Sequence, residues 1–170
     1  AMSNPHIKYS ITLPCYNEEQ NIPSIFERFR DALGVRRDIE VILVNNGSTD
    51  GSGPLLAREQ KKPENSYFKV VTVTKNQGYG FGILSGLNES TGDFLGWTHA
   101  DLQTDPHDIV RAIDILENRG DAKSILLKGK RIKRNVFDSL FTGGMSIISS
   151  IALRSKLSDV NAQPKIFHRS

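Results

Sequence analysis

The feature that most constrains the fold is an alternation of short apolar runs with stretches of helical periodicity, repeated along most of the chain. The run from Glu40 to Val44 is aliphatic after its first residue, which is typical of a strand buried on both faces of a parallel sheet. The stretch before it predicts a helix with one buried stripe, formed by Ile22, Ile25, Phe26, Phe29 and Leu33. Strands and helices that alternate in this way predict an α/β fold, with a mostly parallel sheet flanked by helices on both faces.

The same patterns predict the other elements. We expect six strands, at residues 7–15, 40–44, 68–74, 94–98 and 124–127 and from 165 to 168. We expect helices at 22–33, 53–60, 83–87 and 137–153, and another that begins at Thr104-Asp105-Pro106. No linker or internal repeat divides the sequence, so residues 1–170 are predicted to form a single domain.

Composition excludes several classes of protein. With 38% hydrophobic and 24% charged residues the chain is globular in character, and its net charge of +3 is too small to indicate a nucleic-acid partner. The single cysteine, Cys15, excludes an internal disulfide and suits a reducing compartment. No run approaches the ~20 apolar residues of a membrane-spanning helix, and no secretory signal opens the chain. These features predict a cytoplasmic location.

Four polar clusters directly follow predicted strands, at residues 14–18, 45–50, 76–80 and 99–103. The carboxyl ends of parallel strands meet at one edge of a sheet, where ligands bind. Any one cluster could be an ordinary turn, but four in register favour a ligand site. A dinucleotide fingerprint starting at Gly80 is excluded, because Ser85 stands where its third glycine is needed.

In order and spacing these clusters resemble family 2 glycosyltransferases, closest to the polyprenyl-phosphate branch that includes dolichol-phosphate mannose synthase. The motifs that carry the resemblance are Pro14-x-Tyr16-Asn17-Glu18-Glu19, Val44 to Ser52, Asn76-x-Gly78-x-Gly80 with Gly86, Gly92-Asp93, and His99-Ala100-Asp101-Leu102-Gln103-x-Asp105-Pro106. The match extends from about Tyr9 to Arg169. It implies a GT-A fold, Rossmann-like and C-terminally incomplete, because the family's catalytic domain continues past this point and often into membrane helices.

The resemblance also implies a nucleotide site. Pro14, Tyr16 and Glu18 would contact the nucleoside, and Asn46 would read the base or ribose. The rest of the implied nucleotide-binding set is Asn17, Asn45, Asn76, Gly78, Gly80, His99 and Ala100. The family usually has Asp-Asp where this chain has Asn45-Asn46, and an amide carbonyl can still accept from a base N–H.

The family's Asp-x-Asp metal signature reads His99-Ala100-Asp101 in this chain, and Gln103 occupies a position that also supplies a ligand. Asp101, Gln103 and His99 would therefore hold Mg²⁺ or Mn²⁺ on the donor diphosphate. Imidazole favours Mn²⁺, whereas Mg²⁺ prefers oxygen ligands and keeps several waters. The alternative is that His99 only forms hydrogen bonds within its loop.

The run from Lys128 to Arg134 is densely basic and precedes the predicted helix at 137–153, which carries an apolar stripe. This order is typical of an interfacial membrane helix. Core packing of the helix, a solvated basic loop and a nucleic-acid patch remain alternatives. In the polyprenyl-phosphate branch, Arg131 would meet the acceptor phosphate and Asp159 would lie beneath the acceptor. A phosphate acceptor needs no strong general base, whereas a hydroxyl acceptor does.

The resemblance therefore implies an inverting glycosyltransferase that moves a sugar from a UDP- or GDP-sugar to a polyprenyl phosphate. Its catalytic candidates are Asp101, Arg131 and Asp159, and it would act peripherally at the cytoplasmic membrane face. The alternatives are transfer to a saccharide or lipid hydroxyl, and a non-catalytic module that binds nucleotide-sugar.

Overall fold

The computed structural model describes residues 5–101, 104–118, 127–128 and 165–169. Its centre is a six-stranded sheet in the order β3-β2-β1-β4-β6-β5. The strands are β1 (Tyr9–Cys15), β2 (Ile39–Asn46), β3 (Phe68–Val73), β4 (Phe94–Trp97), β5 (Leu127–Lys128) and β6 (Lys165–His168). β1 lies parallel to both β2 and β4, and β2 lies parallel to β3, whereas β6 is antiparallel to β4 and β5.

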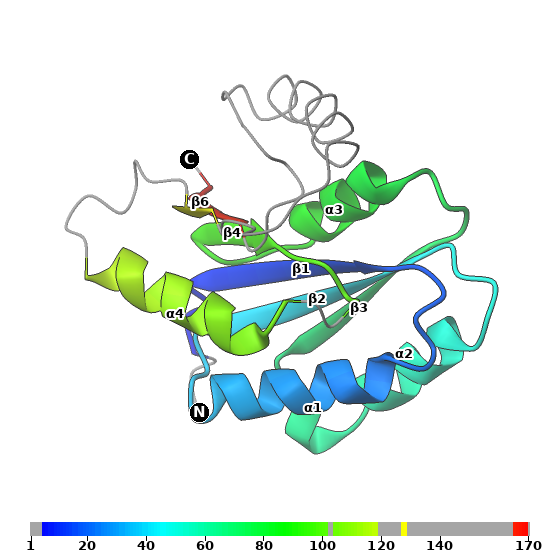
Figure 1. Ribbon diagram of the computed structural model, residues 1–170, viewed down its shortest axis with the longest axis horizontal. Helices are drawn as coiled ribbons and strands as arrows, with labels where there is room; N and C mark the ends of the chain where they lie inside the picture. Colours follow the sequence, from blue (N-terminus) through cyan, green and yellow to red (C-terminus); the bar gives the residue numbers. More distant parts are fainter. Residues whose placement is uncertain (1–4, 102–103, 119–126, 129–164, 170) are drawn as a thin grey trace, which may run out of the picture.

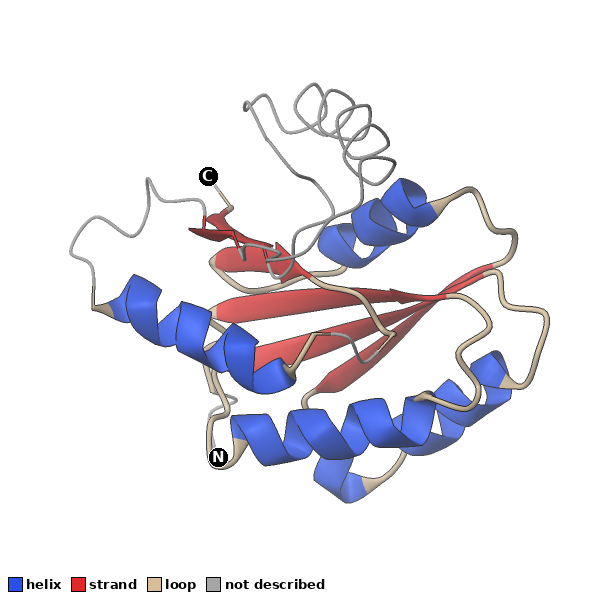
Figure 2. Cartoon of the chain, viewed as in Figure 1, coloured by secondary structure: helices blue, strands red, loops and turns tan. Residues whose placement is uncertain are grey.

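Helices cover both faces of this sheet (Figures 1 and 2). The helices are α1 (Ile22–Leu33), α2 (Ser52–Gln60), α3 (Tyr79–Asn88) and α4 (Pro106–Glu117), with a short 3₁₀ turn at Pro63–Asn65. α1, α2 and α4 lie on one face, and α3 lies on the other (Figure 2). The mostly parallel α/β architecture expected from the alternating pattern is therefore confirmed.

The main core lies between the sheet and the helices α1 and α4. Alternate residues of β1 point into it, because successive side chains of a strand face opposite sides. These residues are Tyr9, Ile11, Leu13 and Cys15, and they join the buried stripes of α1 and α4. The helical spacing in residues 22–33 is thus confirmed as a core-facing stripe.

α3 differs most from its expected extent, since it runs over ten residues and was predicted only at 83–87. Glycines lower helix propensity, so the pattern alone favoured a shorter helix. The structure shows what two of these glycines do: a Cβ on Gly86 would lie 2.3 Å from Cγ2 of Thr12, and one on Gly82 would lie 3.0 Å from Cβ of Pro14. The glycines therefore let α3 pack directly on β1, and this packing stabilises the helix.

The other boundaries agree closely with the prediction. β5 is found at Leu127–Lys128, next to the strand predicted at 124–127, and residues 119–126 lie outside the described part. The helix predicted at 137–153 also lies outside it. Within the described residues, no helix has both the length and the apolar character needed to cross a membrane.

Candidate functional site

The loop after β1 is joined to the loop after β2 by hydrogen bonds through Asn17. The backbone N–H of Asn17 donates to Oγ of Ser48 at 3.1 Å, and its Oδ1 accepts from the N–H of Thr49 at 2.8 Å. Asn17 has a φ of 53°, in the left-handed region that asparagine tolerates better than most residues. The side chain of Asn17 therefore positions the two loops against each other.

Two acidic residues strengthen the same junction. The N–H of Glu18 donates to Oγ of Ser52 at 2.9 Å, and Oε2 of Glu19 accepts from the N–H of Gly51 at 2.9 Å. The Glu18 carboxylate also accepts from Nδ2 of Asn21 at 2.6 Å. Tyr16, by contrast, is 48% exposed, so its ring is open to a ligand at this edge.

The paired asparagines at the end of β2 point to opposite faces of the sheet and have different partners. Oδ1 of Asn45 accepts from the N–H of Ser48 at 3.2 Å, within the turn that leads to α2. Nδ2 of Asn46 donates to the carbonyl of Gly78 at 3.1 Å, on the α3 side. Asn46 is 3% exposed, and within the described residues its Oδ1 has no hydrogen-bond partner. Asn45 acts here as an acceptor and Asn46 as a donor.

The loop after β3 lies against the loop after β2. Oδ1 of Asn76 accepts from the N–H of Gly78 at 2.7 Å, and Gly78 takes a φ of 98° that favours glycine. Gly47 also has a positive φ, and a Cβ there would lie 2.2 Å from the backbone N of Asn76. The two loops touch through their backbones, which explains why glycines occupy these positions.

The fourth cluster, after β4, is joined to the third by an aromatic stack. The ring of Tyr79, the first residue of α3, stacks on the ring of His99, with 4.8 Å between centroids and 17° between planes. Ala100 is buried beside them, and Asp101 is partly exposed. All four polar clusters are therefore linked at the carboxyl edge of the sheet, as their spacing predicted.

His99 and Asp101 are two metal-ligating residue types on one short loop, but no group of three histidine, cysteine or acidic side chains in the described part could hold an ion. Gln103, Arg131 and Asp159 lie outside the described residues. One imidazole and one carboxylate suit a divalent ion that takes its remaining ligands from phosphate or water. The residues present fit such an ion as a partial set of ligands.

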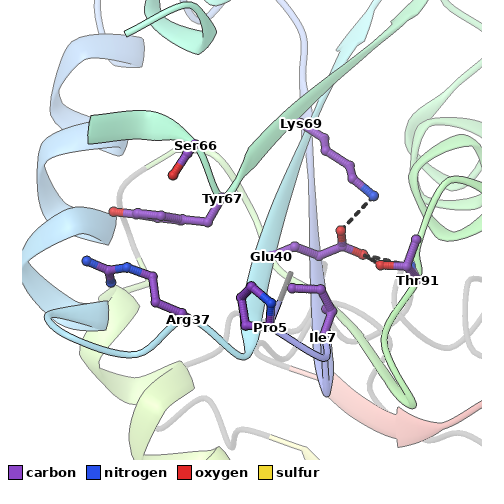
Figure 3. A pocket seen from close by; sticks show the side chains of 8 residues that line it. All are labelled: Pro5, Ile7, Arg37, Glu40, Ser66, Tyr67, Lys69 and Thr91. Atoms are coloured by element: carbon purple, nitrogen blue, oxygen red, sulfur yellow. Dashed lines mark hydrogen bonds and ion pairs between the residues drawn. The ribbon is translucent and has the colours of Figure 1, made fainter. Parts of the chain in front are cut away.

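A cavity of ≈ 380 Å³ lies at the other end of the sheet, near the amino ends of β2 and β3. Figure 3 shows the side chains that surround it. It is lined by Pro5, Ile7, Arg37, Glu40, Ser66, Tyr67, Lys69 and Thr91. The carboxylate of Glu40 pairs with Nζ of Lys69 at 2.7 Å and accepts from the N–H of Thr91 at 2.7 Å. The carboxylate of Glu40 thus joins β2 to β3 and to the loop before β4. No residue of the four polar clusters lines this cavity.

The structure also brings forward a residue that the sequence reasoning did not select. Tyr79 lies inside the Asn76-x-Gly78-x-Gly80 motif at a position counted as variable, so only its aromatic character could have drawn attention. Ser48 and Ser52 likewise connect the loops, although the sequence pattern did not indicate them as site residues. Their role depends on contacts between segments about 30 residues apart.

The sequence also matches a known protein family. The profile described as Glycosyl transferase family 2 matches residues 10–143. The chain belongs to this family of glycosyltransferases.

Similar curated proteins place the chain near one branch of the family. An undecaprenyl-phosphate 4-deoxy-4-formamido-L-arabinose transferase of Yersinia enterocolitica is 36% identical over 115 residues, which are 67% of this chain and 35% of that protein. The protein of the same name from Photorhabdus laumondii is 34% identical over 135 residues, 79% of this chain and 39% of its own length. The chain thus spans well under half the length of these relatives.

Solved structures confirm the GT-A fold. A mannosyltransferase from Pyrobaculum calidifontis, in complex with GDP-mannose and Mn²⁺, aligns with a TM-score of 0.66 and 20% identity, over 97% of this chain and 45% of that chain. Glucosyl-3-phosphoglycerate synthase from Mycobacterium tuberculosis, with Mn²⁺, UDP and its product, aligns at 0.64 and 19% identity, over 96% and 57%. At these identities the likeness concerns the fold.

Proposed function

We propose that this chain is the donor-binding part of an inverting glycosyltransferase that takes a UDP- or GDP-sugar and a polyprenyl-phosphate acceptor. The observation that carries the proposal is the linkage of four strand-end loops into one edge, where Tyr79 stacks on His99 and Asp101 follows two residues later. The fold also aligns with enzymes solved with GDP-mannose or UDP. The names of the curated relatives support the undecaprenyl-phosphate acceptor.

In this mechanism an acceptor phosphate oxygen attacks the anomeric carbon of the donor in line with the bond to the leaving group. The bond between the anomeric carbon and the diphosphate oxygen breaks, and the nucleoside diphosphate departs with the electron pair. His99 and Asp101 would hold a divalent ion, whose charge stabilises the departing diphosphate when it is bound. Tyr16, open at this edge, would contact the nucleoside. The phosphate acceptor is ionised near neutral pH, so no general base is required of the chain.

A thermal-shift experiment tests the donor site, with UDP, GDP and their sugars, each with Mn²⁺, with Mg²⁺ and with a chelator. A ligand at a hundred times its dissociation constant stabilises the fold by ~2.7 kcal/mol. At roughly 2–4 °C per kcal/mol for a chain of this size, the melting temperature rises by roughly 5–10 °C. The unphosphorylated nucleosides are the matched control. If no nucleoside diphosphate shifts melting with or without metal, the donor-site proposal is wrong.

The acceptor and the membrane surface need a separate test on the full-length protein, because residues 129–164 lie outside the described part. We expect binding to anionic vesicles to fall when Lys130, Arg131, Lys133 and Arg134 are changed to serine. Each basic residue near such a surface contributes ~1 kcal/mol, and added salt weakens binding by screening. Salt-independent binding, or none in the wild type, would exclude a membrane role for this segment. A product formed only with a hydroxyl acceptor would establish the alternative reaction.

A further inference from the structure

Tyr79 makes the only described ring contact between the third and fourth polar clusters. It is the first residue of α3, directly after Gly78, whose φ of 98° turns the chain into the helix. From there its side chain reaches the ring of His99 at the end of β4. Tyr79 therefore connects α3 to the loop that carries His99 and Asp101.

The stack constrains the orientation of the imidazole. The two rings are nearly parallel, at 17°, so the face of His99 is covered by the phenol ring while its nitrogens lie in the ring plane at the edge. An imidazole binds a metal through a nitrogen in that plane. A stacked ring can thus be held in one orientation without using the atoms that bind a ligand.

The hydroxyl of Tyr79 is a second, independent observation. It is buried, and within the described residues it has no hydrogen-bond partner. A buried O–H without an acceptor destabilises a fold, which indicates that an acceptor is supplied when a ligand binds.

We infer that Tyr79 binds and positions the donor: its ring orients His99, and its hydroxyl donates to a diphosphate oxygen of the nucleotide. The inference rests on the proposed function, since the diphosphate belongs to the nucleotide-sugar. An anionic oxygen is the acceptor expected beside a cation held by His99 and Asp101. Hydrogen bonds to charged groups are stronger than neutral ones, so this contact contributes to affinity as well as orientation.

The test compares Tyr79→Phe and Tyr79→Leu in the full chain. Calorimetric titration with UDP and with GDP, each in Mn²⁺, measures affinity. Tyr79→Phe keeps the ring and removes the hydroxyl, so we expect affinity for the nucleoside diphosphate to fall about 10- to 150-fold, the worth of a hydrogen bond to a charged group. The melting temperature of the free protein should stay unchanged or rise, because an unpaired buried O–H is removed. A merely structural tyrosine would instead lose stability and keep affinity.

NMR of the histidine ring protons tests the orienting role without any nucleotide. The chain has 4 histidines, so a His99→Asn spectrum assigns the signals of His99. Tyr79→Phe should leave these signals in place, and Tyr79→Leu should shift them, because the ring current is lost. Tyr67→Phe, which removes a phenol near the other end of the sheet, is the matched control and should change neither affinity nor the His99 signals.

Several outcomes would overturn the inference. Equal affinity of wild type and Tyr79→Phe for UDP and GDP excludes the contact between the hydroxyl and the diphosphate. Unmoved His99 signals in Tyr79→Leu exclude the orienting role. If the wild type binds neither UDP nor GDP, the proposed function fails and the hydroxyl role fails with it, while the NMR comparison still decides the orienting role.

Discussion

Replacing Asn46 with aspartate changes one atom of a buried side chain and reverses its hydrogen bond. Nδ2 of Asn46 donates to the carbonyl of Gly78 at 3.1 Å, and the side chain is 3% exposed. An ionised aspartate has only acceptors, so it would place a negative oxygen against a carbonyl oxygen at the start of α3. We expect Asn46→Asp to destabilise the fold although the two side chains have almost the same shape.

The expected loss of unfolding free energy has two parts. Loss of the hydrogen bond costs about 0.5–1.5 kcal/mol. Burial raises the pKa of the new carboxyl, and a rise of about two units adds about 2.7 kcal/mol at neutral pH. The cost of ionising the buried carboxyl is absent below the unfolded-state pKa of about 3.9, and it grows as the pH rises from there to the folded-state pKa. The variant should therefore lose about 3–4 kcal/mol near pH 7 and about 1 kcal/mol or less in acid, where the protonated carboxyl can donate to Gly78.

Urea denaturation of wild type and variant between pH 3.5 and 7.5 measures this difference. Asn45→Asp is the matched control, one residue away on the opposite face. Oδ1 of Asn45 accepts from the N–H of Ser48, and a carboxylate keeps this bond close to the start of α2, where negative charge is favourable. We expect the control to lose less than about 1 kcal/mol. The reasoning is refuted if Asn46→Asp is as stable as wild type at pH 7, if its loss does not depend on pH, or if Asn45→Asp loses as much.

Three further predictions use other parts of the chain. Asp101→Asn should weaken metal-dependent nucleotide binding far more than His99→Asn, because only Asp101 brings a formal negative charge to the cation. Calorimetry showing equal losses, or the larger loss at His99, would make histidine the principal ligand. Gly86→Ala should lower the stability measured by thermal denaturation by about 1–3 kcal/mol, because its new Cβ would lie 2.3 Å from a β1 side chain. Gly80→Ala, whose Cβ would have nothing within 4 Å, should be neutral or stabilising by about 0.5–1 kcal/mol. Equal effects of the two substitutions would refute close packing of α3. Glu40→Gln should lower stability by about 1–3 kcal/mol at neutral pH. Burial raises the pKa of Glu40, but hydrogen bonds from Lys69, Ser10 and Thr91 hold it below the ordinary 4.5. The difference in unfolding free energy between wild type and variant should therefore narrow as the pH falls through this lowered pKa. A difference that stays constant from pH 7 to 3 would contradict this.

Much of the architecture follows from local patterns in the sequence. The run from Glu40 to Val44 and the stripe from Ile22 to Leu33 predicted a buried strand and its preceding helix, and the structure places both within a residue or two. Hydrophobic period is a property of neighbouring residues, so it can be read without knowing the fold. The meeting of four polar clusters at one edge followed from the same reading, because parallel strands end on the same side.

Tertiary structure decided what depends on contacts between distant segments. The low helix propensity of the glycines in α3 predicted a short helix, yet the helix spans Tyr79–Asn88 because Gly82 and Gly86 let it approach β1. The different tasks of Asn45 and Asn46 come from the faces they meet, one at the turn before α2 and the other at Gly78. The stack of Tyr79 on His99 joins residues 20 positions apart. Hydrophobic periodicity and helix propensity are properties of a single segment, whereas these features depend on which surfaces the folded sheet brings together.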